Sequence, residues 1–206
     1  MFNWSTHIFI HPCVWWIHKS RRTHILYKLN TAKPEGPRFT TPYYYSYFFE
    51  LFFCFFGIFQ FIPTIRKRSL SRHKTLGAVV VISGELSSLT DVWLAHYYDF
   101  PKELQGELLY WSRLIIGPLM ALFIIQSLVV LRKKSFSSHG KYMLRAYAIA
   151  QGASTQTFFS ILWGLLTVYK LEGNNRDILM LSSWFFNMIL IELFIHKSYV
   201  LADSNT

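Results

Sequence analysis

The sequence predicts an all-α protein that crosses a membrane several times as a bundle of transmembrane helices. Of its 206 residues, 52% are hydrophobic and 16% are charged, whereas a soluble domain usually carries about 25% charged residues. The hydrophobic residues are gathered into runs, and several runs approach the roughly 20 residues that a helix needs to cross the hydrocarbon core. Basic segments separate some of these runs, as the cytoplasmic loops of membrane proteins do.

Five hydrophobic runs are predicted to be the membrane spans, and a polytopic bundle of six spans is the alternative. The five runs are residues 43–62, 76–96, 108–131, 143–169 and 178–199. Prolines before the first run, after it, and between the second and third limit the helices there. The chain is thus expected to divide into an aromatic, His-rich basic leader at 1–42, a transmembrane helical bundle at 43–201 and a short polar tail at 202–206.

Residues 2–17 of the leader are the candidate sixth span. This segment is apolar and aromatic, but it is short, and histidines and a proline interrupt it. We expect instead an interfacial helix with tryptophan side chains at the level of the headgroups. On such a helix His7, His11 and His18 share one stripe. Together with His96 they could form an outward metal or haem site, or they could simply lie among headgroups.

Two basic segments set the expected orientation of the bundle. Residues 66–74 read RKRSLSRHK and residues 132–141 read RKKSFSSHGK, and neither contains an acid. Because cytoplasmic loops are enriched in Lys and Arg, we expect both segments in the cytoplasm. Five spans then leave the N-terminus outside and the C-terminus in the cytoplasm. The basic leader conflicts with this placement, since its own cations would also favour the cytoplasm.

The net charge of +10 does not predict nucleic-acid binding. The cations lie between hydrophobic runs rather than along one face of a helix, and such a pattern is typical of membrane loops. The lipid bilayer is therefore the expected partner, and we expect no nucleic acid. Whether the chain also assembles into a larger membrane protein complex or a homo-oligomer is left open.

Each basic segment contains a histidine close to the start of the hydrophobic run that follows it. His73 and His139 are expected at the same membrane face, and His196 near the cytoplasmic end of the last run. Three imidazoles at one depth could ligate a transition metal, and two could hold a b-type haem between helices. Helix capping, or contact with lipid phosphates, would account for the same residues without a cofactor.

Acidic residues inside the runs form a second group of candidates. Glu192 lies one helical turn before His196, so its carboxylate could orient the imidazole for proton transfer or form an ordinary pair. Glu85 lies deep in the second run, where it could be an acid/base group or a residue that ties helices together. Asp91 and Arg113 lie near the outer ends of neighbouring runs and could pair.

A polar patch follows the middle of the fourth run. Gln151, Ser154 and Thr155 are spaced to share one helix face. With Asn187 and Glu85 they could line a cavity for a polar group of a substrate. Residues of this kind more often hold membrane helices together through hydrogen bonds.

Three motifs resemble a bacterial family of predicted multi-pass integral membrane proteins whose domain has no assigned function. They are GIFQFIPTIRKRSLSRHKTLG at 57–77, SSHGKYMLRAYAIA at 137–150 and NMILIELFIHK at 187–197. The middle one matches H-x-x-W-M-x-R-x-Y, with Tyr142 where the family tends to have tryptophan. The resemblance implies a compact helical membrane bundle in a bacterial inner membrane. It also makes Arg145 a candidate cofactor-binding residue, but it implies no reaction.

Three functions therefore remain as hypotheses. The first is a redox protein or haem/metal-binding bundle that uses His73, His139 and His196. The second is an intramembrane enzyme on a lipid or isoprenoid-like substrate, with Glu85, Glu192 and His196 as acid/base residues. The third is a non-catalytic membrane subunit or small transporter. The sequence lacks a Walker loop and a G-x-S-x-G motif, so hydrolase and kinase functions lose their usual support. Whether the protein is an enzyme stays open.

Overall fold

The computed structural model describes residues 40–98, 100, 102 and 104–203, and these residues form helices without any strand. The predicted all-α fold class is thereby confirmed. The interfacial helix and the alternative sixth span were predicted within the first 39 residues, which lie outside the described part of the chain.

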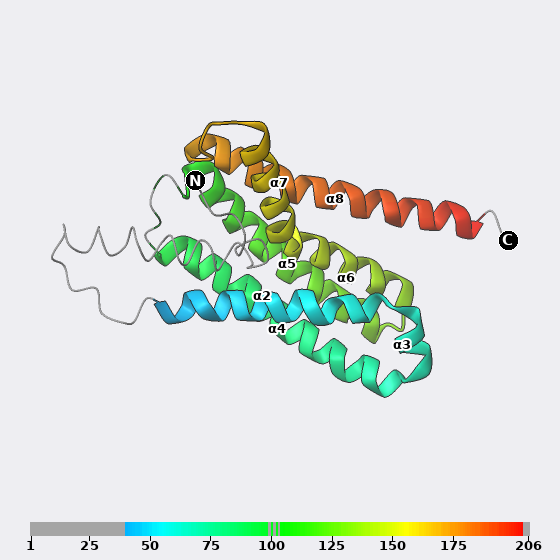
Figure 1. Ribbon diagram of the computed structural model, residues 1–206. Helices are drawn as coiled ribbons and strands as arrows, with labels where there is room; N and C mark the ends of the chain where they lie inside the picture. The colour runs from blue at the N-terminus through cyan, green and yellow to red at the C-terminus, as the bar shows by residue number, and fades with distance from the viewer. Residues whose placement is uncertain (1–39, 99, 101, 103, 204–206) are drawn as a thin grey trace, which may run out of the picture. The chain divides into compact units, whose positions relative to one another are not determined.

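The first two long helices form a hairpin. Helix α2 (Thr40–Phe61) runs along α4 (Leu70–Tyr97), and the short helix α3 (Pro63–Arg68) joins them at one end (Figure 1). A proline at the first position of α3 suits a helix start, because the missing N–H would have no intrahelical partner there. Ser69 then begins α4 as its N-cap, with its side-chain oxygen accepting from the Arg72 N–H at 3.4 Å.

A second hairpin follows, built from α5 (Glu107–Arg132) and α6 (Phe136–Ala150). Helix α5 packs antiparallel to α4, because Gly84 of α4 lies beside Ile124 while Val92, further along α4, lies beside Gly117. The antiparallel packing returns the end of α5 to the level at which α4 begins. Residues 63–74 and 132–141 therefore lie at one end of the bundle, which we call the basic end (Figure 1).

The fourth predicted span is not one continuous helix. Helix α6 ends at Ala150, and α7 (Gly152–Leu166) begins after Gln151. A side chain at position 152 would collide with the indole of Trp184 on α8 (Gly173–Asp203). Close approach of α8 thus requires glycine at this break.

Asn187 of α8 satisfies polar groups beside the break. Its side-chain nitrogen donates to the Ala148 carbonyl oxygen at 3.2 Å, and its oxygen accepts from the Thr155 hydroxyl at 2.9 Å. Backbone groups freed inside a membrane need such partners, because lipid provides none. For Thr155 and Asn187, the prediction that polar residues hold the helices together is confirmed.

Among the described residues, three helices are long and apolar enough to cross a membrane: α4, α5 and Gly173–Ser198 of α8. Helix α2 and the α6–α7 pair occupy the remaining two predicted positions. Helices α6 and α7 have 15 residues each, and about 22 Å of helix does not cover a hydrocarbon core of roughly 30 Å. The count of five spans therefore stays a prediction.

The core lies where α2, α4, α5 and α6 meet. Phe53 and Ile124 are fully buried there, and both would collide with any side chain at Gly84. The buried hydrophobic cluster is made of Phe53, Val80, Met120, Ile124, Met143, Ala146, Ile149 and Ala150. Many large apolar side chains on the outer surfaces of α2, α5, α7 and α8 are exposed, as expected of surfaces that face lipid tails.

Candidate functional site

His139 is the fourth residue of α6 at the basic end, and it is held by α5. Its ring nitrogen Nδ1 lies 2.7 Å from the Ser127 hydroxyl oxygen and 3.2 Å from the Ser127 carbonyl oxygen. Ser127 is completely buried. A carbonyl oxygen can only accept, so the contact favours a proton on Nδ1 and a lone pair on Nε2. Histidines that bind metals through Nε2 are usually oriented in this way.

His73 is the fourth residue of α4, and its hydrogen bonding favours the other tautomer. In the orientation that satisfies both ends of its amide, Gln60 of α2 donates to His73 Nδ1 (3.0 Å) and to the His73 carbonyl oxygen (3.2 Å). The Gln60 oxygen then accepts from the Gly77 N–H at 3.2 Å. The reverse orientation would bring two N–H donors together. The proton of His73 is therefore favoured on Nε2.

Glu192 is bonded to Arg145 rather than to His196. The Arg145 guanidinium donates from Nε to one carboxylate oxygen at 2.5 Å and from its terminal nitrogen to the other at 2.9 Å. The Arg145 guanidinium also lies 5.6 Å from the centre of the Tyr142 ring. This two-point ion pair joins α6 to α8. His196 is exposed one turn further along α8.

Glu192 and His196 nevertheless line one shallow groove of about 490 Å³ on α8. The other lining residues are Phe185, Met188, Ile189 and Leu193. The groove is thus apolar over most of its length, with an ion-paired carboxylate and an imidazole toward its C-terminal part.

The predicted metal ligands are not gathered into one cluster. Within the described part of the chain, no three His, Cys, Asp or Glu side chains are placed to hold a metal ion together, and His73, His139 and His196 are all in that part. The leader histidines of the predicted outward site lie outside it. His96, their predicted partner, lies with its Nδ1 3.0 Å from the Tyr110 hydroxyl.

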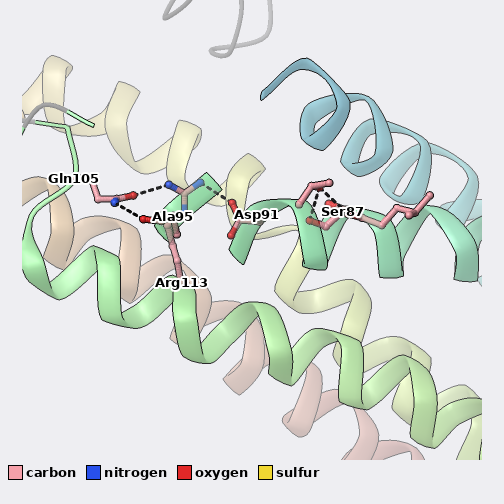
Figure 2. A network of polar contacts seen from close by, with 7 residues as sticks. Ser87, Asp91, Ala95, Gln105 and Arg113 are labelled. Carbon is pink, nitrogen blue, oxygen red and sulfur yellow. Dashed lines mark hydrogen bonds and ion pairs between the residues drawn. The ribbon is translucent and has the colours of Figure 1, made fainter. Parts of the chain in front are cut away.

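The far end of α4 and the start of α5 carry a polar network, which we call the network end (Figure 2). The predicted pairing of Asp91 with Arg113 is confirmed, with 2.6 Å between a terminal guanidinium nitrogen and a carboxylate oxygen. Gln105 accepts from the other terminal nitrogen of Arg113 at 2.8 Å and donates to the Ala95 carbonyl at 3.4 Å. The Phe100 ring lies 5.3 Å from the Arg113 guanidinium. The α4–α5 connection is thereby folded over the ion pair.

Glu85, the candidate acid/base residue of α4, has one buried carboxyl oxygen without a hydrogen-bonding partner among the described residues. Ser88 donates to the backbone carbonyl of Glu85, at 2.9 Å, and not to its carboxyl group. The hydrogen bond from Ser88 therefore does not fix the position of the Glu85 carboxyl group.

Asp177 is a structural residue that the sequence did not single out. It is 2% exposed, and its two carboxylate oxygens accept from the backbone N–H groups of Gly106 (3.2 Å) and Leu109 (3.1 Å). A residue of α8 thus caps the first turn of α5. No local pattern could have indicated this role, because the two segments are far apart in the sequence.

The helices, their apolar surfaces and the polar groups between them define an integral membrane protein. Residues 47–195 match the family described as "Predicted membrane protein (DUF2306)", and the chain belongs to this family. The predicted family resemblance is confirmed. No curated protein and no solved structure matches the chain.

Proposed function

We propose that the protein is a membrane haem- or metal-binding protein and that His139 is its principal ligand. The observation that supports this proposal is the contact of His139 Nδ1 with the buried Ser127 carbonyl. It holds the imidazole in the tautomer whose Nε2 lone pair can bind a metal ion. A haem iron, when bound, would supply one-electron transfer.

His73 is the second proposed ligand, and it fits less directly. Its Nε2 carries the proton in the favoured tautomer, so ligation requires the proton to move to Nδ1 and the Gln60 amide to turn over. His139 is therefore expected to bind first and more tightly. Because both oxygens of Glu192 accept from Arg145, that arginine positions α6 against α8 in this proposal.

The test is an optical spectrum with metal analysis of the full chain, purified in detergent after growth with added haem precursor. We expect a Soret band that is lost in His139→Ala and weakened in His73→Ala. Gln105→Ala is the control, since Gln105 lies at the network end and the change should leave the spectrum unchanged. A colourless and metal-free preparation, or a band that survives His139→Ala, would refute the proposal.

Glu85 supports a second candidate function, that of an intramembrane enzyme on a lipid or isoprenoid-like substrate. One carboxyl oxygen of Glu85 is buried and has no hydrogen-bonding partner within the described part of the chain, so it is available to a polar group of a substrate or to a proton. In cells whose own copy is deleted, the wild-type chain should restore a changed lipid profile and Glu85→Gln should not. Glu107→Gln, at an exposed position of α5, is the control. An unchanged lipid profile on deletion would remove this candidate.

A further inference from the structure

The two basic segments are copies of one pattern. Residues 66–73 read RKRSLSRH and residues 132–139 read RKKSFSSH, so Arg, Lys, Ser, Ser and His recur in the same order and spacing. The same offset relates Gln60 to Gln126. It also relates α2 to most of α5, and α4 to most of the α6–α7 pair.

In the structure, the returning helix of each copy begins directly after the first serine of the pattern. Ser69 and Ser135 are the N-caps of α4 and α6. Their carbonyl oxygens accept from the N–H groups of His73 and His139 at 3.1 and 3.0 Å. Each histidine then contacts the preceding helix of its own hairpin, through Gln60 or Ser127. The bundle therefore contains two helical hairpins that point the same way. They differ in detail, because the Ser69 side chain caps α4 while the Ser135 side chain donates to Ser138.

The first residue of the returning helix is apolar and exposed in both copies. Leu70 is 56% exposed at the start of α4, and Phe136 is 68% exposed at the start of α6. At the end of a membrane bundle they are placed to enter the acyl region of the bilayer.

Exposed cations accompany these apolar residues. In the first copy they are Lys67, Arg68 and Arg72, and in the second they are Arg132, Lys133 and Lys134. Among the described residues, no acid forms an ion pair with any of these six. Cations beside a membrane surface attract anionic headgroups, at about 1 kcal/mol per Lys or Arg.

We propose that the two copies are two matched sites for anionic phospholipids, so that the basic end holds two such lipids, one on each hairpin. The cations of each copy bind the phosphate, and Leu70 or Phe136 lies among the acyl chains. A nucleic acid or a free phosphate would satisfy the cations but leave both apolar side chains in water. The combination of charge and exposed apolar surface selects a lipid.

Native mass spectrometry of the full chain from mixed micelles tests the proposal. With phosphatidylglycerol we expect two retained lipids, and with phosphatidylcholine at the same concentration none above background. Lys67→Gln with Arg68→Gln should leave one retained lipid, as should Lys133→Gln with Lys134→Gln. The four changes together should leave none.

Two controls separate charge from other effects. Lys102→Gln with Lys170→Gln removes two exposed cations outside the basic end and should leave both lipids bound. Lys133→Arg with Lys134→Arg keeps the charge and should also retain both. The melting temperature of each variant without lipid shows whether it is folded, and glycerol phosphate tests the headgroup without its acyl chains.

Equal retention of phosphatidylglycerol and phosphatidylcholine would overturn the proposal. Retention of phosphatidylglycerol that is unchanged in the fourfold variant would also overturn it. Loss of both lipids from changes in one loop would show a single shared site in place of two matched ones. Stabilisation by glycerol phosphate equal to that by phosphatidylglycerol would show that the cations bind phosphate without using Leu70 and Phe136.

Discussion

The two ends of the bundle differ in whether their charged side chains are paired. At the network end, Arg113 is bonded to Asp91 and Gln105 and covered by Phe100, and Asp177 caps the start of α5. At the basic end, exposed cations have no acid partner among the described residues. The first arrangement ties helices together, while the second leaves charge available to a partner. Substitutions at the network end should therefore lower stability, and substitutions at the basic end should alter binding.

Arg113→Leu should have the largest effect on stability. It leaves the Asp91 carboxylate without its cation inside a predicted membrane span, and it frees Gln105 as well. We expect the free energy of unfolding to fall by about 3–5 kcal/mol, measured by denaturant titration in mixed micelles. Lys170→Leu is the control, because the Lys170–Glu172 pair is exposed and is worth at most about 1 kcal/mol. Equal effects of the two changes would contradict the comparison.

Asp177→Ala should have an intermediate effect. The change removes a buried acceptor from two backbone N–H groups at the start of α5, and we expect a loss of about 2–3 kcal/mol. Asp177→Asn keeps one side-chain oxygen and nearly the same volume, so it should lose less. Hydrogen exchange at the first turn of α5 should become faster in both variants, with the larger increase in Asp177→Ala. Unchanged exchange there would argue against the capping role.

Lys133→Gln with Lys134→Gln should have the smallest effect on stability. Both side chains are exposed and unpaired among the described residues, and such changes usually stay within about 0.5 kcal/mol. Thermal unfolding in uncharged detergent provides the measurement. A loss as large as that of Asp177→Ala would mean that the basic end is part of the structural framework.

Helix positions could be predicted where proline and charge interrupt the hydrophobic runs, but helix ends could not. The second run was expected at 76–96, whereas α4 begins at Leu70. Hydropathy marks the part of a helix that lies in lipid, while Ser69 caps a helix that continues into polar sequence. The break at Gly152 was missed for a different reason. It depends on Trp184 of α8, and glycine alone is common in transmembrane helices.

Among the site residues, too, some contacts could be predicted from the sequence and others depended on how the helices pack. The Asp91–Arg113 pair could be predicted, because both residues interrupt neighbouring runs at similar depths. For Glu192 the nearest partner in sequence was His196, yet the structure bonds it to Arg145 of another helix. Spacing within one helix cannot reveal which helix packs against it. The recurrence of the basic pattern was readable from the sequence, but its shared geometry needed the caps and contacts of the folded chain.

The break between α6 and α7 also leads to an expectation about the order in which the chain enters the bilayer. Each half has 15 residues and is too short to cross the hydrocarbon core alone, at about 1.5 Å per residue. The groups beside the break find their partner on Asn187, which the ribosome adds later. We therefore expect the fourth segment to reach its final depth only after the last helix has been synthesised, so that α8 completes membrane insertion.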